Sequence, residues 1–223
     1  MDKTAPFRID LHVHTCYSND CTTTLDDVVH YAQKRGLSGV AITDHNTAEG
    51  ALKLLEKKPP LMVIPGIEVS TSRGHILGIN TTSPIPRGLS VKETTKRIHE
   101  AGGIAIAAHP SAIFKDGIGL NAEIASSGID AIEVVNSSAF PFLLLTRLNR
   151  RFAGRLHFPQ TAGSDSHLPE TIGLAYTLIE NIVLRPDIGG VIQAIKKGTV
   201  LPFGKPTPWA LRFKKIKKEI KKY

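Results

Sequence analysis

Histidines and carboxylates occur in this chain at the spacing of metal ligands. His12 and His14 are separated by one residue within an apolar stretch, and Asp165 and His167 have the same spacing. Alternate residues of a strand point to one face, so each pair can reach a single ion. Imidazole nitrogen mixed with carboxylate oxygen suits zinc, manganese or iron(II) and suits calcium poorly. The pattern predicts a transition-metal site.

Further residues of the same types stand at the ends of other apolar segments. Asp44 and His45 follow the segment 39–43, Glu68 follows 61–64, and His109 follows 104–108, whereas His75 opens 75–79. In α/β barrels the C-terminal ends of the strands converge, which is where sites assemble. We therefore expect these side chains to meet His12, His14, Asp165 and His167 at one end of the fold.

Short apolar runs alternate with helical patterns along the chain. The strand candidates are residues 8–13, 39–43, 61–64, 75–79, 104–108, 131–135, 158–162 and 174–179, and the clearest helix candidates are 25–35, 46–57 and 91–101. Thr24 and Ser90 are typical N-caps for the first and third of these helices. The alternation predicts an α/β fold with a largely parallel sheet. A barrel is favoured over an open nucleotide-binding sheet, because no GxGxxG or GxxxxGK[ST] turn is present.

The chain has 223 residues, which is enough for one domain with a single core. No stretch approaches the roughly 20 apolar residues of a membrane helix, and the N-terminus lacks an apolar signal region, so we expect a cytoplasmic protein without a membrane span. Cys16 and Cys21 are the only cysteines, too few for a disulfide framework. We interpret them as reduced thiols, and a redox or metal role beside His14 is the alternative.

Nearly all of the net charge of +8 lies at the C-terminus. Residues 205–223 carry +7 and residues 1–204 carry +1. The apolar residues of this tail recur at helical spacing, at Trp209, Phe213, Ile216, Ile220 and Tyr223. We therefore divide the chain into a catalytic barrel, 1–204, and a basic amphipathic helix, 205–223. The helix either packs its apolar stripe on the barrel or uses its lysines to contact a polyanion such as nucleic acid, with an anionic membrane surface as a third option.

The ordered set of ligand-type residues resembles the PHP family, named for polymerase and histidinol phosphatase. The resemblance extends from Arg8 to about Pro208. It implies a distorted, TIM-like β/α barrel of seven strands with a metal cluster at the C-terminal strand ends. It also implies two or three divalent ions, zinc, manganese or iron, as cofactors.

The trinuclear form of the family implies a particular division of the ligands. One ion would be held by His12, His14, Glu68 and Asp165, a second by Glu68, His75 and His109, and a third by Asp20, His45 and His167. Glu68 would bridge the first two ions. The family often places the loop aspartate five residues after the second histidine, where this chain has Asn19; Asp20 is one position further on.

The chemistry expected of such a cluster is phosphate-ester hydrolysis. A water shared between divalent ions about 3.5–4 Å apart becomes hydroxide near neutral pH, and the ions neutralise the phosphate oxygens. Glu68, Asp165 and His167 are the catalytic candidates because they would act through this hydroxide. No serine or cysteine nucleophile is needed, Gly-x-Ser-x-Gly is absent, and Ser164 is interpreted as scaffold.

Four more residues are candidates for supporting roles. Asp10 and Asp44 precede ligand-type histidines and are expected to orient them. Arg73 and Asn136 are candidates for substrate binding, Arg73 through a bidentate contact with phosphate. The substrate is expected to be a phosphorylated metabolite, a nucleotide or a nucleic-acid end. The alternative is a non-catalytic RNA-binding subunit similar to the barrel protein of ribonuclease P, which would be expected to have lost ligands.

Overall fold

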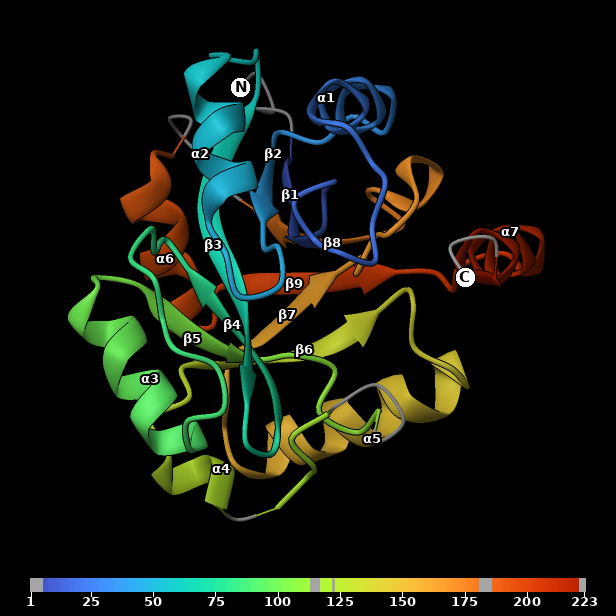
Figure 1. The fold of residues 1–223 in the computed structure, drawn as a ribbon. Coiled ribbons are helices and arrows are strands. Elements are labelled where there is room, and N and C mark those ends of the chain that lie inside the picture. The colour runs from blue at the N-terminus through green and yellow to red at the C-terminus, as the bar shows by residue number, and fades with distance from the viewer. Residues whose placement is uncertain (1–5, 113–116, 122, 181–185, 221–223) are drawn as a thin grey trace, which may run out of the picture.

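A twisted sheet forms the centre of the molecule. The computed structural model describes residues 6–112, 117–121, 123–180 and 186–220, and within them nine strands are hydrogen-bonded in the order β7-β6-β5-β4-β3-β2-β1-β8-β9 (Figure 1). The strands are β1 (Phe7–Val13), β2 (Gly39–Ile42), β3 (Met62–Thr71), β4 (Gly74–Ile79), β5 (Ile104–Ala107), β6 (Ala131–Asn136), β7 (Gln160–Gly163), β8 (Ala175–Ile179) and β9 (Val200–Gly204). β4 is antiparallel to both of its neighbours, and β8 is antiparallel to β1 and β9. The start of β4 therefore lies at the same rim as the C-terminal ends of its neighbours.

The two ends of the sheet approach each other, so the sheet is nearly closed into a barrel. The segment after β7 returns to β1, where the Asp165 N–H donates to the His12 carbonyl (2.8 Å) and the His14 N–H donates to the Ser166 carbonyl (3.1 Å). β7 also meets β8, because the Ala162 N–H donates to Thr177 Oγ1 at 2.9 Å. These bonds bring the ends of β1 and β7 together, although the two strands are far apart in the sheet order.

The expected count of seven strands is wrong for the described residues. The two additional strands are β8 and β9, which are paired antiparallel from Ala175–Gly204 to Ile179–Val200. The sequence does not reveal β9 because Pro202 interrupts its short apolar run. Proline lacks an N–H donor and is tolerated on an edge strand, which is where β9 lies.

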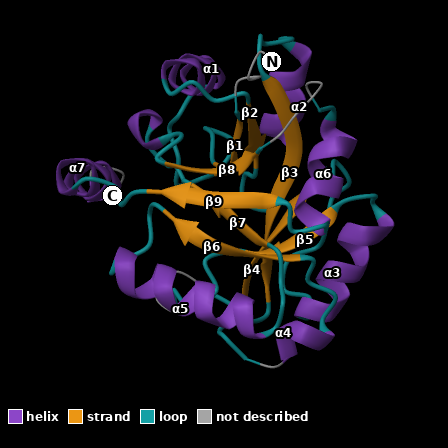
Figure 2. Ribbon diagram, turned by 180° about the vertical axis from the view of Figure 1, so that it is seen from behind, coloured by secondary structure: helices purple, strands orange, loops and turns teal. Residues whose placement is uncertain are grey.

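Helices surround the sheet (Figures 1 and 2). They are α1 (Leu25–Lys34), α2 (Glu49–Glu56), α3 (Val91–Glu100), α4 (Glu123–Ser126), α5 (Phe142–Arg155), α6 (Ile188–Lys196) and α7 (Trp209–Ile220), with a 3-10 turn, η2 (Pro169–Thr171). Among the residues described, no helix combines the length and apolar character needed to cross a membrane.

The predicted helix starts are confirmed for α1 and α3 and corrected for α2. Thr24 caps α1 in a capping box with Asp27, and the Ser90 hydroxyl accepts from the Glu93 N–H of α3. The expected helix at 46–57 begins only at Glu49. Asn46 has a left-handed backbone (φ 57°), and its side chain is hydrogen-bonded to Ser70 of β3. It therefore lies in the loop before α2 and not in the helix.

The apolar core lies between the sheet and the helices. Three clusters of buried side chains fill this layer, and Ile9 and Leu11 of β1 pack with Val191 and Ile195 of α6 in one of them. Alternation along β1 turns the intervening polar residues to the opposite face, where Asp10 and His12 are fully buried. The helix layer is therefore apolar, whereas the inner face of the sheet at this end carries polar side chains.

Gly163, the last residue of β7, lets His12 and Glu133 approach the backbone of β7. A Cβ at this position would clash with the His12 Cβ and would lie 2.7 Å from Glu133 Oε1. No rotation of the new methyl group can relieve contacts with atoms this close. Glycine is needed here because of close packing.

We predict that Gly163→Ala destabilises the fold by about 1–3 kcal/mol, the usual cost of overpacking, and that it also weakens metal uptake because His12 is displaced. Denaturant unfolding and metal analysis measure the two effects. Gly154→Ala in α5 is the matched control, because a Cβ there meets nothing within 4 Å. This control should gain up to about 1 kcal/mol from helix propensity and keep its metal. Equal stability of the two variants would contradict the packing argument.

Candidate metal centre

The carboxylate of Glu68 lies at the centre of a histidine cluster. Its Oε1 is 3.1 Å from His75 Nδ1 and 3.1 Å from His109 Nε2. Its Oε2 is 3.2 Å from both His14 Nε2 and His45 Nδ1. Glu68 is 1% exposed, and burial alone would raise its pKa, but the neighbouring histidines outweigh burial and hold the pKa well below the ordinary glutamate value. Both oxygens face nitrogen donors, as expected of a bridging carboxylate.

His12 and His14 converge as their spacing predicted. Their Nε2 atoms are 3.1 Å apart, and Asp165 Oδ1 lies 3.9 Å and 3.6 Å from them respectively. Burial opposes charge on His12, but the carboxylates of Glu133, Glu68 and Asp165 raise its pKa well above the ordinary value. Burial, together with His167, lowers the pKa of His14 to about 3. The local field thus favours positive charge, while His14 remains a neutral nitrogen donor.

Asp20, His45 and His167 meet at the mouth of the cluster. Asp20 Oδ2 is 2.8 Å from His167 Nε2 and 3.5 Å from His45 Nε2. Burial would raise the pKa of Asp20, but the hydrogen bonds from these two histidines outweigh it and lower the pKa. Asp20 is 43% exposed, in contrast to the fully buried His12. The structure therefore places Asp20, at the shifted position, beside the two predicted partners.

The donor set fits divalent metal ions. Four groups have three ligand atoms within 4.8 Å of one another: His12 with His14 and Asp165, His12 with Glu68 and His109, His45 with Glu68 and His75, and His14 with His45 and His167. Two imidazole nitrogens facing each other at 3.1 Å with carboxylates around them are the arrangement that shared cations stabilise. Nitrogen with carboxylate oxygen is the donor mixture of zinc, manganese and iron(II) sites.

Glu133 of β6 orients two of these histidines and was not identified from the sequence. Its Oε1 accepts a hydrogen bond from His12 Nδ1 (3.0 Å), and its Oε2 accepts from the His109 backbone N–H (2.9 Å). With its proton on Nδ1, His12 directs the lone pair of Nε2 into the cluster. The sequence signal was a single acid within the apolar run Ala131–Asn136, where a buried charge needs a partner.

Asp44 was expected to orient the adjacent His45, but its side chain contacts Ser18, which lies beside His14. The Ser18 hydroxyl donates to Asp44 Oδ1 (2.9 Å) and lies 3.2 Å from His14 Nδ1. Ser18 also accepts from the His45 backbone N–H (3.0 Å). Asp10 was also expected to orient a histidine, and its contact with His12 is to the backbone. It accepts from the backbone N–H groups of His12 (3.2 Å) and Ser164 (2.8 Å), which ties β1 to the segment after β7.

The backbone at the cluster is irregular where ligands are presented. His109 and Asp165 have positive φ angles of 29° and 52°, a conformation that residues other than glycine rarely adopt. The pairing of β1 with β2 shifts between Asp10 and Val13, and that of β6 with β7 shifts between Glu133 and Val135. Such irregularities redirect side chains at strand ends. They allow residues of neighbouring strands to point at one centre.

The two candidates for substrate binding differ in exposure and in what they contact. Arg73 is exposed in the turn between β3 and β4 and is not among the residues that line the metal cavity. Asn136 is buried, and its Nδ2 donates to Glu133 Oε2 (2.9 Å) and approaches Asp165 Oδ2 (3.4 Å). Its Oδ1 accepts from the N–H groups of Ser138 and Ala139. Asn136 is thus engaged in holding Asp165 and the loop after β6.

The cluster opens into a cavity of about 180 Å³ that includes one residue from the C-terminal helix. Its lining residues are Asp20, His45, Glu68, His75, His109, Asp165, His167 and Lys215. In the sequence, Lys215 is one of several lysines of the basic tail 205–223. In α7, however, Lys214 pairs with Glu170 of η2 while Lys215 borders the cavity.

The apolar stripe of α7 is not buried on the barrel as one interpretation expected. Trp209, Phe213 and Ile216 are 60%, 59% and 49% exposed. Arg212 attaches the helix instead, through hydrogen bonds to the carbonyls of Ser137, Ser138 and Ala139. Tyr223, Lys221 and Lys222, also part of the predicted tail, lie outside the described residues, as do the side chains of Lys218 and Ile220.

Comparison with known proteins agrees with this geometry. A family model for the PHP domain matches residues 10–193. An uncharacterised protein of Methanocaldococcus jannaschii is 39% identical over 143 residues, covering 58% of this chain and 82% of that protein. A 5′-3′ exoribonuclease of Escherichia coli is 34% identical over 106 residues, covering 43% of this chain and 36% of the exoribonuclease.

A solved structure shows the same fold. The lesion-specific endonuclease Q of Pyrococcus furiosus superimposes with a TM-score of 0.68 at 21% identity, covering 89% of this chain and 59% of the endonuclease. At this identity the likeness concerns the fold. The strand ends that carry the clustered histidines lie within the range 10–193 that the family model matches.

We predict that Glu133→Gln weakens metal affinity by about 10–100-fold, the usual effect of losing a residue that orients a ligand. Glutamine has the same shape but no charge to hold the His12 Nδ1 proton. Titration of the metal-depleted protein with zinc or manganese measures the affinity. Glu93→Gln, on the exposed face of α3, is the control and should bind as the parent does. Unchanged affinity in Glu133→Gln would remove Glu133 from the site.

A second prediction separates Asp20 from Asn19. Asp20 contacts His45 and His167, so Asp20→Asn should lower the metal content by about one ion per chain, whereas Asn19→Ala should leave it unchanged. Elemental analysis of protein purified without chelator gives the stoichiometry. The reverse pattern would assign the ligand to Asn19, and no loss in either variant would indicate a two-metal site.

Proposed function

The chain belongs to the PHP domain family, and on that premise we propose that it is a metal-dependent hydrolase of phosphate esters. The observation that carries this proposal is the position of Glu68, whose two carboxylate oxygens face histidines from four different segments of the barrel. A structural ion pair needs one partner. A carboxylate shared by several imidazoles at the floor of an open cavity is typical of a catalytic multinuclear centre.

Nine residues are proposed to hold the ions: His12, His14, Asp20, His45, Glu68, His75, His109, Asp165 and His167. Bound divalent ions supply an activated water near neutral pH and neutralise negative charge on phosphate. The protein's own residues orient the donors. His12, His14 and His167 each have Nδ1 within 3.2 Å of a hydrogen-bonding oxygen, on Glu133, Ser18 and the Asp165 carbonyl respectively. Nε2 of each ring is thereby left as the donor atom.

No serine or cysteine side chain is among the residues that line the metal cavity. Ser164 is fully buried, and its hydroxyl donates to the His12 carbonyl at 3.3 Å. Lys215 adds a positive charge at the edge of the cavity, where it can contact a phosphate oxygen of the substrate. These positions favour attack by water over a covalent protein intermediate.

The proposed substrates are a phosphorylated metabolite, a nucleotide or the end of a nucleic acid. Relatives that match parts of this chain include an exoribonuclease and a phosphodiesterase acting on a cyclic phosphate. The alternative of a non-catalytic RNA-binding subunit expects missing ligands. The convergence of all nine predicted residues supports the hydrolase instead.

Glu68→Gln tests the proposed function. The parent, purified without chelator, should contain two to three equivalents of zinc, manganese or iron and should release phosphate from part of a panel of mono- and diesters. Glu68→Gln should lose metal and at least about 100-fold in kcat, because one residue contacts most of the cluster. A rate within threefold, only ~0.65 kcal/mol of barrier, would exclude a bridging role. A parent with no metal, and no uptake on addition, would overturn the proposal.

A further inference from the structure

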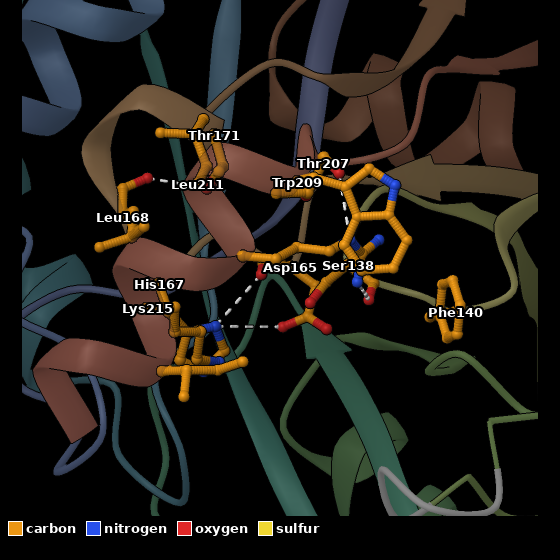
Figure 3. Close-up of a pocket in the computed structure, with 12 residues that line it drawn as sticks. Ser138, Phe140, Asp165, His167, Leu168, Thr171, Thr207, Trp209, Leu211 and Lys215 are labelled. Atoms are coloured by element: carbon orange, nitrogen blue, oxygen red, sulfur yellow. Dashed lines mark hydrogen bonds and ion pairs between the residues drawn. The ribbon is translucent and has the colours of Figure 1, made fainter. Parts of the chain in front are cut away.

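A second cavity adjoins the metal cavity, and five residues of α7 line it. Its volume is about 380 Å³, within the range of small-molecule sites. Asp165, His167 and Lys215 line both cavities. Figure 3 shows His167 and Lys215 on one side of the second cavity, Phe140 and Trp209 on the other, and Asp165 between them. A ligand with its phosphate in the metal cavity therefore has room to extend its remaining part towards the aromatic residues.

The far wall of this cavity is aromatic and is held in place by α7. The rings of Phe140 and Trp209 are in edge-to-face contact, with centroids 5.3 Å apart at 68°. The Arg212 guanidinium lies 5.6 Å from the Phe140 centroid and 6.0 Å from that of Trp209. Because Arg212 also donates to three carbonyls of the loop after β6, helix and loop are joined, and the wall is preformed.

The exposure of this wall distinguishes it from a core contact. Phe140 and Trp209 are each 60% exposed although they touch each other. An indole face at the edge of a cavity offers a surface on which another flat ring can stack, and the contact suits any nucleobase because each has a π-face. Ser138, Thr171 and Thr207 also line the cavity, so its lining is not purely apolar.

We propose that this second cavity is a nucleobase subsite, in which the base of a nucleoside phosphate stacks on Trp209 while Lys215 contacts the phosphate at the junction of the two cavities. The inference rests on the proposed function and specifies its substrate class. The position of Lys215 supports the assignment, because this residue lines both cavities. The ligand is a free nucleotide or the terminal residue of an oligonucleotide.

The chain carries its own probe for this subsite, since Trp209 is its only tryptophan. The metal-loaded protein is titrated with the methylene phosphonate analogue of AMP, in which carbon replaces the ester oxygen and no bond is cleaved. The matched ligand is the same analogue of ribose 5-phosphate, which lacks the base. We expect saturable quenching of tryptophan fluorescence by the first and none by the second. Equal responses, or none to either, would overturn the subsite.

Variants locate the contact. Trp209→Ala, followed by calorimetry, should weaken binding of the AMP analogue by roughly fivefold or more, the lower range for loss of one stacked base, whereas Trp209→Phe should retain most of it. Lys215→Gln should weaken both analogues because it contacts phosphate. Leu143→Ala, at an exposed apolar residue of α5, and Lys217→Gln, on the exposed side of α7, are the matched controls and should bind as the parent does. Unaltered binding in Trp209→Ala would refute the proposal.

Turnover separates this proposal from the proposed function. If the parent hydrolyses AMP and ribose 5-phosphate with equal kcat/KM, and Trp209→Ala changes neither, the enzyme stands and the subsite fails. If the AMP analogue binds in a base-dependent way but no phosphate ester is hydrolysed, the subsite stands and the enzyme assignment fails. Both proposals predict a kcat/KM for AMP at least fivefold above that for ribose 5-phosphate. Comparing a 5′-phosphorylated tetranucleotide with AMP in the same assay shows whether the preferred substrate is an oligonucleotide end or a free nucleotide.

Discussion

The buried carboxylate of Glu68 imposes the constraint that this end of the barrel satisfies. An ionised group that is 1% exposed costs several kcal/mol unless opposite charge and hydrogen bonds compensate it. Five imidazoles surround it, and one of them, His14, is kept neutral by burial. Divalent cations bound by these residues would supply further positive charge and make the whole set favourable. Strand ends that are remote in sequence must therefore meet around one centre.

Side chains that contact the proposed ligands through hydrogen bonds fix the orientation of these ligands. Glu133 holds His12 and the backbone of His109, and Asp44 holds Ser18, which in turn contacts His14. The left-handed backbone at His109 and Asp165 is strained, so surrounding bonds must maintain it. The sheet supplies them: the Asp165 N–H is bonded to the His12 carbonyl, and the His109 N–H is bonded to Glu133.

In the proposed function, the C-terminal helix connects the metal centre with the choice of substrate. The proposed metal ligands come from the barrel, whereas the second cavity is formed jointly by the loop after β6, the segment after β7 and α7. Its aromatic wall depends on Arg212, which joins α7 to the barrel. Changes in α7 can thus alter which group is accommodated beside the phosphate without disturbing the donors. Such a division allows one metal centre to serve different substrates.

Much of the metal centre was determined by local sequence. The one-residue spacing of His12 and His14 puts both rings on one face of a strand, and apolar runs ending in Asp44-His45 and His109 place ligands at a common rim. The caps at Thr24 and Ser90 likewise specified the starts of α1 and α3. These features depend on residues that are close in the chain, so the physics of a strand or a helix end suffices to predict them.

Other features were decided only by the tertiary structure. Glu133 is hydrogen-bonded to His12 although the two residues are 121 positions apart in the chain. This contact can be recognised only when the positions of β6 and β1 in the fold are known. β9 exists because an edge of β8 is available to pair with it, despite Pro202. Lys214 and Lys215 are adjacent and identical in type, yet one pairs with Glu170 and the other borders the metal cavity. Their difference arises from where α7 is attached to the barrel, because a charge pattern specifies a helix face but not the surface that this face will meet.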